Sequence, residues 1–221
     1  MTASAPLRLH AFCQSGNSYK VAFALRAMGL PYESVHVDFL AGRTRDAQWR
    51  ARTNEMGEVP VLDDGAKRLT QSGVILTHLA RKSGRFGGRN DDEQQEVLRW
   101  LLFDNHKFTS YFATYRFMTA FAPAAPDPAV LGFLKPRIDS AYGIVDQHLA
   151  GREWLVGDAP TIADFSLSGY LFYPRDESGI DAAAGRPHLG AWIQRLRGLE
   201  GWADPYAVLP GERVAPRWTA Q

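Results

Sequence analysis

The apolar pattern of this chain changes once, at a glycine-rich stretch between residues 84 and 90, and that change limits the folds it can adopt. Before the stretch, short runs rich in strand-forming residues alternate with segments whose apolar residues recur at helical spacing. After it, the pattern is helical throughout. A sheet covered by helices, followed by a helical bundle, buries both patterns. The sequence therefore predicts an α+β chain with domains at 1–83 and 92–221, joined by a linker at 84–91.

The first domain is predicted to run β-α-β, then a short helix near 45–51, then β-β-α. Strands are expected at 7–12 and 32–37, with a helix between them that ends at Gly29. Because a helical crossover joins them, these strands should be parallel. The turn signal Asp63-Asp64-Gly65 separates two further short strands, which predicts a hairpin.

The second domain is predicted to be all helical. A long helix is expected over 93–121, with a broad apolar stripe. Pro136 falls inside the next helical pattern, where it either kinks the helix or begins it. Thr161 and Asp164 have the spacing of a capping box before an apolar run, and this accounts for the acid without a catalytic role.

Composition argues against several classes of protein. The 221 residues carry a net charge of +1, which gives no long-range field to attract nucleic acid or acidic lipid. The N-terminal sequence does not resemble a signal peptide, and no apolar run reaches the roughly 18 residues that span a membrane. We therefore expect a cytoplasmic protein that binds neither nucleic acid nor membranes. The histidines share no ligand spacing, so no metal site is expected.

Two motifs twelve residues apart predict a pocket for a small peptide. Val59 precedes Pro60, and a residue before proline is held in the extended region; if the bond is cis, its N–H and C=O face outward. Gln71-Ser72 opens an amphipathic helix, and Ser72 is expected at its N-cap, where a hydroxyl and free amides favour an anion. Together the two motifs are expected to bind the backbone and the carboxylate of a small peptide.

With these elements in order, the sequence resembles the cytosolic glutathione transferase superfamily over essentially its whole length. The segments that carry the resemblance are 12–21, 57–62, Gln71-Ser72 and 161–164. Their order is specific to the superfamily but does not identify a class. The resemblance implies a thioredoxin-like first domain, an all-helical second domain, a homodimer and a detoxifying enzyme of the kind found in bacteria.

The resemblance also implies roles for individual residues. Val59 would pair with the cysteinyl backbone of glutathione beside Pro60, and Gln71 and Ser72 would bind its γ-glutamyl carboxylate. The sulfur would face Ser15 or Asn17, and these two positions compete for the same role. Cys13, the single cysteine, lies two residues before Ser15, the position expected to face the sulfur. It is interpreted as a half-buried structural thiol.

Other parts of the site are less closely specified. Glu58 stands where many relatives have Lys or Gln, and an acid there would repel the glycyl carboxylate. Arg43, Arg45 or Arg52 would compensate, and their spacing alone does not decide among the three. Asp104 either reaches the ligand's amino group across a dimer or is a solvated or interface acid. Aromatic residues of the long helix would pack the core or line a cleft for an apolar second substrate: Tyr111, Phe112 and Tyr115.

The predicted function is that of a glutathione S-transferase, which stabilises the glutathione thiolate and joins it to a largely apolar electrophile. Glutathione is a substrate here, and no metal is required. Two alternatives remain. One is glutathione-dependent reduction of disulfides or peroxides, suggested by Asn17. The other is a non-catalytic interaction module that keeps the fold, suggested by Glu58.

Overall fold

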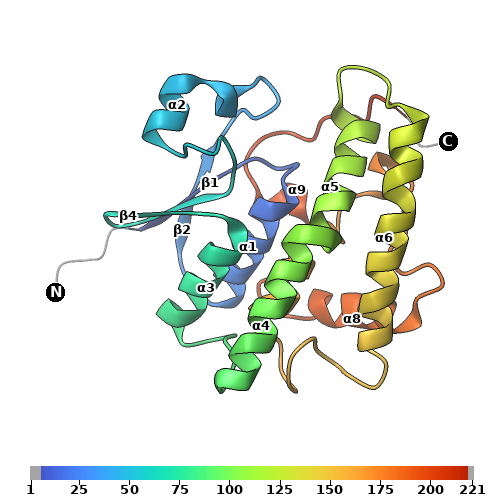
Figure 1. Ribbon diagram of the computed structural model, residues 1–221. Helices are drawn as coiled ribbons and strands as arrows, with labels where there is room; N and C mark the ends of the chain where they lie inside the picture. Colours follow the sequence, from blue (N-terminus) through green and yellow to red (C-terminus); the bar gives the residue numbers. More distant parts are fainter. Residues whose placement is uncertain (1–5, 219–221) are drawn as a thin grey trace. The chain divides into compact units, whose positions relative to one another are not determined.

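Four short strands form one mixed sheet near the beginning of the chain (Figure 1). The chain is described here by a computed structural model of residues 6–218. The strands are β1 (Leu7–Ala11), β2 (Tyr32–His36), β3 (Val61–Asp64) and β4 (Lys67–Thr70), in the order β2-β1-β3-β4. β1 and β2 are parallel, whereas β3 is antiparallel to both β1 and β4. The predicted crossover and hairpin are both confirmed.

The helices beside this sheet are α1 (Gly16–Ala27), α2 (Ala47–Arg52) and α3 (Ser72–Ser83). α1 and α3 pack against each other (Figure 1). Alternate residues of β1 are buried, which is the pattern of a strand with one face on a core. α1 ends at Met28, and Gly29 follows in the left-handed conformation (φ 68°), as expected of a helix stop.

A C-terminal segment, residues 199–213, belongs to the same compact unit as the sheet. Among the described residues, the contacts divide the chain into one unit of 6–85 plus 199–213 and a second unit of 86–198 plus 214–218. Within the first unit, Arg26 Nε donates to the Gly201 carbonyl (2.8 Å) and the Tyr19 hydroxyl to the Ala203 carbonyl (2.9 Å). The segment includes the short helix α9 (Pro205–Val208), which contacts α1. Sequence reasoning had placed it with 92–221.

The second unit is helical in the described residues, as predicted. Its helices are α4 (Asp91–Phe103), α5 (Thr109–Arg116), α6 (Pro128–His148), α7 (Ile162–Leu167) and α8 (Pro187–Arg197). The long helix expected over 93–121 is present, but wider π-helical turns interrupt it at 104–108 and 117–121. Pro136 lies inside α6, so it does not begin that helix.

The predicted capping box begins α7 and is the centre of a buried network. Asp164 is fully buried, and one carboxylate oxygen accepts from Thr161 N–H (2.8 Å). The other accepts from Leu155 N–H (3.1 Å) and the Trp192 indole (2.9 Å). Burial raises the pKa of this carboxyl, while its donors act in the opposite direction. Asp164 therefore connects α7 to α8 and to the loop that precedes α7.

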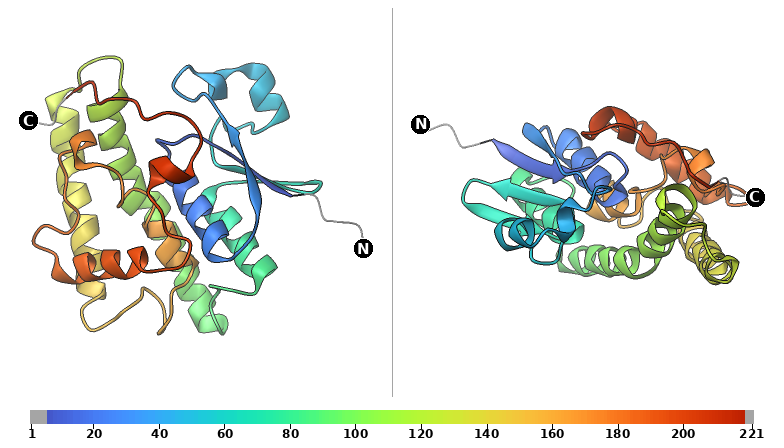
Figure 2. Two further views of the ribbon diagram at one scale, coloured as in Figure 1. Left: turned by 180° about the vertical axis from the view of Figure 1, so that it is seen from behind. Right: turned by 90° about the horizontal axis from the view of Figure 1, so that it is seen from above.

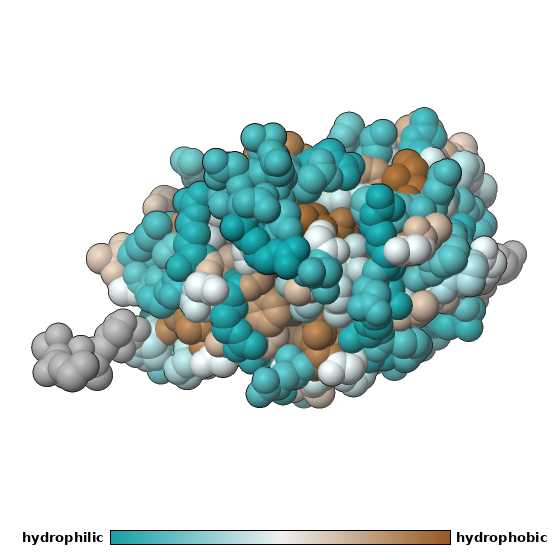
Figure 3. Space-filling model, turned by 90° about the horizontal axis from the view of Figure 1, so that it is seen from below, coloured by the Kyte–Doolittle hydropathy of each residue, from teal (hydrophilic) through white to brown (hydrophobic). Residues whose placement is uncertain are grey.

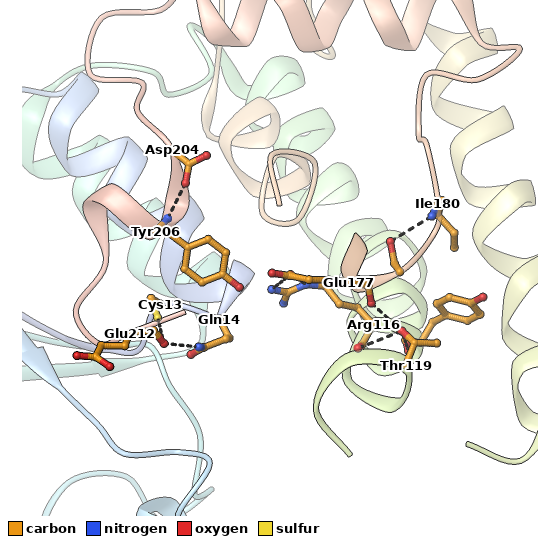
Figure 4. A network of polar contacts seen from close by, with 11 residues as sticks. Cys13, Gln14, Arg116, Thr119, Glu177, Ile180, Asp204, Tyr206 and Glu212 are labelled. Atoms are coloured by element: carbon orange, nitrogen blue, oxygen red, sulfur yellow. Dashed lines mark hydrogen bonds and ion pairs between the residues drawn. The ribbon is translucent and has the colours of Figure 1, made fainter. Parts of the chain in front are cut away.

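A buried ion pair fixes another loop of the helical unit (Figure 4). Arg116 Nη2 lies 2.5 Å from Glu177 Oε2, and both side chains are almost completely buried. Thr119 donates to the Glu177 carbonyl (2.8 Å), and the Arg116 guanidinium lies over the ring of Tyr173 (3.9 Å). A buried charge pair needs such additional partners to offset desolvation. These contacts hold the loop between α7 and α8 against α5.

The exposed surface is largely hydrophilic on the face shown in Figure 3, where apolar side chains gather in small groups. Among residues 6–218, no helix combines the length and hydropathy that a membrane span requires. Within the same residues, no three His, Cys, Asp or Glu side chains cluster in a way that could hold a metal ion.

Candidate functional site

The strand register brings three separate sequence motifs to one end of the sheet. His10, near the end of β1, is opposite Val61 of β3, and Val61 is opposite Thr70, the last residue of β4. The chain beyond these pairs is the turn before α1, the Val59-Pro60 segment and Gln71-Ser72. Both α1 and α3 also begin there, so two positively polarised helix termini lie at the same end of the sheet.

Ser15 is the N-cap of α1. Its hydroxyl oxygen accepts from Ser18 N–H (3.1 Å) and from the Ser18 hydroxyl (3.0 Å). The helix begins at Gly16, directly after this cap. Since the Ser15 oxygen accepts both bonds, its own O–H remains able to donate to a bound anion.

Asn17 lies in the first turn of α1 and is only partly buried. Its side-chain oxygen is nevertheless buried and has no hydrogen-bond partner among the described residues. A buried polar atom without a partner is costly, and a bound molecule that supplies one would remove that cost. Asn17 and Ser15 therefore both stay candidates for contact with a ligand at this helix terminus.

The bond between Val59 and Pro60 is cis. Neither the N–H nor the C=O of Val59 takes part in a backbone hydrogen bond between described residues. The preceding loop is close to another segment: a Cβ on Gly57, which has φ 69°, would lie 2.8 Å from the Thr44 carbonyl oxygen. Only glycine fits such a position, and it sets the path of the chain into Val59.

The start of α3 differs from the prediction by one residue. Gln71, with φ 66°, is the N-cap, and Ser72 is the first helical residue, so the expectation that Ser72 caps the helix is wrong. Ser72 is buried, and none of the described residues hydrogen-bonds its hydroxyl. Its hydroxyl and the free amides of the first helical turn provide donors for an anion.

Glu58 connects two of the motifs. Its carboxylate accepts from the Gln71 side-chain amide (2.7 Å), which also lies 3.3 Å from the Met56 sulfur. No sequence pattern marks this pair, because the two residues are thirteen positions apart. The contact places the negative charge of Glu58 beside Gln71, the residue before α3.

The basic residues near this end of the sheet lie on its surface. Arg43 is exposed, and its guanidinium is 3.9 Å from the Asp46 carboxylate, a loose contact. It belongs to the short helical turn Arg43–Arg45, whose middle residue Thr44 is the one that approaches Gly57. Arg43 is therefore on a segment that packs beside the loop leading to Val59.

Cys13 is more buried than predicted. The side chain has no exposed surface, and its Sγ donates to the Glu212 carbonyl (3.2 Å). The same carbonyl accepts from Gln14 Nε2 (2.7 Å), as Figure 4 shows. The C-terminal segment 199–213 thus covers the turn just before Ser15. Sequence reasoning did not anticipate this, because the acceptor is a backbone carbonyl that no residue type marks.

Asp104 is a structural acid within the helical unit. It is completely buried, and its two carboxylate oxygens accept from the hydroxyls of Thr109 (2.6 Å) and Ser166 (2.6 Å). Burial of this kind contradicts the expectation of a solvated acid and argues against a ligand role. The π-helical turn that contains Asp104 is fixed by these two bonds.

The three aromatic residues predicted for a second-substrate cleft differ in burial. Tyr111 is partly exposed, whereas Phe112 and Tyr115 are buried. Within the helical unit, the Phe112 ring contacts the rings of Tyr142 (centroids 6.2 Å apart) and Tyr170 (5.9 Å). Phe112 therefore belongs to the packing between α5 and α6.

Comparison with known proteins agrees with this arrangement. Residues 5–81 match the family model "Glutathione S-transferase, N-terminal domain", and residues 108–200 match "Glutathione S-transferase, C-terminal domain". The chain is 28% identical to glutathione S-transferase 3 of Zea mays, over 93% of this chain and 96% of the relative. It resembles crystal structures of glutathione S-transferases from Xanthobacter autotrophicus (33% identity, TM-score 0.80, 90% and 96% covered) and Pseudomonas fluorescens (30%, 0.81, 91% and 99%).

Proposed function

Because the chain belongs to the cytosolic glutathione transferase superfamily, we propose that it binds glutathione and transfers the thiolate to a largely apolar electrophile. One observation carries this proposal: three motifs lie together at the same end of the sheet. They are the turn before α1, the Val59-Pro60 segment and Gln71-Ser72. Each supplies groups that have no partner within the described residues and that match a part of the tripeptide. A homodimer in the cytoplasm, which the resemblance implies, stays a prediction.

In the proposed complex, the tripeptide lies along the segment before β3. The free N–H and C=O of Val59 pair with the cysteinyl backbone, beside Pro60. Ser72 and the first amides of α3 bind the γ-glutamyl carboxylate, next to Gln71. Arg43 is the proposed partner of the glycyl carboxylate, because its segment packs beside this loop and its own ion pair is loose.

The chemistry requires that the glutathione thiol lose its proton. A free thiol has a pKa near 8.5, so about a few per cent is thiolate at pH 7, and the thiolate is the nucleophile. A hydrogen bond from Ser15 or Asn17, together with the N-terminus of α1, stabilises the charged form. The proton passes to solvent, the sulfur forms a bond to the electrophilic carbon, and the leaving group departs with its electron pair. Proximity supplies much of the remaining acceleration.

The proposed second substrate is apolar, and Tyr111 and Tyr115 of α5 are the aromatic residues we assign to it. Phe112 is left out because its ring packs against the rings of Tyr142 and Tyr170 within the helical unit. The Tyr115 hydroxyl has its pKa raised by burial, so it is protonated at neutral pH and can donate a hydrogen bond.

Two alternative functions are a glutathione-dependent reductase and a non-catalytic interaction module. Reduction through a protein thiol would need an accessible cysteine, and Cys13 is buried and hydrogen-bonded to Glu212. A non-catalytic module is favoured by one specific contact, the Glu58 carboxylate on the Gln71 amide, which occupies a group that a ligand would use. Binding and turnover experiments separate the three functions.

Replacing Ser72 by alanine is expected to weaken glutathione binding by about 1–3 kcal/mol, because the bound carboxylate loses a buried hydrogen-bond donor. Isothermal titration calorimetry measures this directly. The matched control is Ser83→Ala at the other end of α3, where the hydroxyl donates to the Ala80 carbonyl and accepts from the Arg85 N–H. Equal affinities in Ser72→Ala and the wild type would remove Ser72 from the site and weaken the proposed function.

Replacing Glu58 by glutamine is expected to tighten glutathione binding by about threefold, since it removes a negative charge but keeps an acceptor for Gln71. The gain should shrink as salt is raised. Glu55→Gln, an exposed acid in the same loop, is the control. Weaker binding by the Glu58 variant would show that this carboxylate contacts a positive group of the ligand, contrary to the proposed orientation.

A further inference from the structure

A methionine side chain that is open to solvent contacts one residue of the proposed glutathione site. Met56 belongs to the loop between α2 and β3, which can be followed from the helix to the sheet in Figure 2. It is 53% exposed. The other methionines among residues 6–218 are Met28, which is buried, and Met118, which is partly buried. Met56 is therefore the methionine of the described chain that a dissolved oxidant reaches most readily.

Hydrogen bonds to the backbone of this loop fix the position from which the side chain extends. Asn54 Oδ1 accepts from the Met56 N–H (3.1 Å), and Asn54 Nδ2 donates to the Glu58 carbonyl (2.9 Å). Arg50 donates from Nε (2.9 Å) and Nη2 (2.7 Å) to the Glu55 carbonyl. These bonds hold the loop in one path and keep the Met56 sulfur within reach of the residue before α3.

Gln71 is the residue that the Met56 sulfur contacts. The amide nitrogen of its side chain carries two hydrogens and donates to Glu58 Oε2 (2.7 Å) and to Met56 Sδ (3.3 Å). A thioether is a weak acceptor, whereas a carboxylate forms strong, charge-assisted hydrogen bonds. The γ-glutamyl carboxylate that we place beside Gln71 therefore displaces the sulfur from this amide and leaves the Glu58 carboxylate bound.

We propose that Met56 is a modification site at which hydrogen peroxide controls the affinity for glutathione, an inference that rests on the function proposed above. The sulfur attacks one peroxide oxygen, an S–O bond forms and the O–O bond breaks. The proton on the transferred oxygen passes to the leaving hydroxide, which departs as water, and the sulfur is oxidised by two electrons to the sulfoxide. The sulfoxide oxygen is a stronger acceptor than the thioether, so it retains the Gln71 N–H that the γ-glutamyl carboxylate requires.

The experiment is calorimetric titration of the full-length protein with glutathione, before and after treatment with hydrogen peroxide. Catalase removes the peroxide before the titration, because peroxide also oxidises glutathione. The tryptic peptide 53–67 contains Met56 as its single methionine, so mass spectrometry of this peptide gives the oxidised fraction. The affinity should fall about fivefold as Met56 is converted. It should recover after treatment with methionine sulfoxide reductases specific for the two sulfoxide epimers.

Three variants test the assigned contact. Met56→Leu keeps the side-chain volume but removes the sulfur, so it should bind glutathione within about twofold of the wild type and should not respond to peroxide. Met118→Leu, the matched change in the helical unit, should respond as the wild type does. Gln71→Gly removes the amide and suits the positive φ of this position. Its affinity should be lower from the start and unchanged by oxidation of Met56.

The outcomes separate this inference from the proposed function. If the untreated protein does not bind glutathione, both are overturned. If it does bind, the inference alone is overturned by an unchanged affinity after complete oxidation of Met56, or by slower oxidation of Met56 than of Met28. An equal loss of affinity in peroxide-treated Met56→Leu, or a response of Gln71→Gly to peroxide, would also overturn it, because the effect would then arise from another group.

Discussion

Replacing Ser15 by glycine is expected to lower the rate of glutathione conjugation at pH 7 by about tenfold. The substitution removes the hydroxyl that we propose as a donor to the sulfur, and the pKa of the bound thiol should rise by about one unit. The rate should recover as the pH rises towards 9, because the thiolate then forms without assistance. The measurement is a pH profile of kcat/KM with a chlorinated aromatic substrate.

Glycine is the informative replacement at this position because Ser15 also caps α1. Alanine at an N-cap costs about 1 kcal/mol of stability, whereas glycine costs only a few tenths. Ser15→Gly and Ser15→Ala should therefore lose the same activity while differing in stability. Such a result separates the donor from the cap.

Parallel variants decide between the two candidates for the sulfur. Asn17→Ala should show the same shift of the pH profile if Asn17 is the donor and no shift if Ser15 is. Cys13→Ala should keep the wild-type profile, since the Cys13 thiol bonds the Glu212 carbonyl. Loss of activity in Cys13→Ala alone would move the chemistry to the protein thiol and contradict the account.

Replacing Asp164 by alanine is expected to lower the free energy of unfolding by about 3–5 kcal/mol, the largest stability change that we predict. The change leaves four buried donors without this acceptor: the N–H groups of Thr161 and Leu155, the Thr161 hydroxyl and the indole of Trp192. Urea denaturation followed by tryptophan fluorescence gives the value.

The control for this change is Asp158→Ala. Asp158 pairs with Arg89 at 2.6 Å, but its side chain is 76% exposed. Exposed ion pairs contribute little, so this variant should stay close to the wild-type stability. If Asp164→Ala were no less stable than Asp158→Ala, the buried network would not hold α7 in place.

The parts of the fold that the sequence predicted are those encoded by local patterns. The crossover from β1 to β2, the hairpin at Asp63-Asp64-Gly65 and the capping box of Thr161 and Asp164 each depend on residues close together in the chain. Their periodicity and turn chemistry carry the information. The positions of Ser15, Val59-Pro60 and Gln71-Ser72 at one end of the sheet follow from the resulting strand order.

The features that sequence reasoning missed depend on contacts without a sequence pattern. The segment 199–213 bonds the first unit largely through carbonyls of Gly201, Ala203 and Glu212, and every residue type has a carbonyl. The burial of Asp104 depends on Ser166, which is sixty-two residues away. The cap of α3 is one residue early because Gln71 adopts a positive φ, which its residue type does not favour.

The most direct test of the central claim is a crystal structure of the protein soaked with glutathione. The account predicts the sulfur within hydrogen-bond distance, about 3.5 Å, of the side chain of Ser15 or Asn17. It also predicts the cysteinyl backbone paired with Val59 and the glutamyl carboxylate on Ser72. A tripeptide bound elsewhere, or one whose sulfur contacts Cys13 instead, would contradict it.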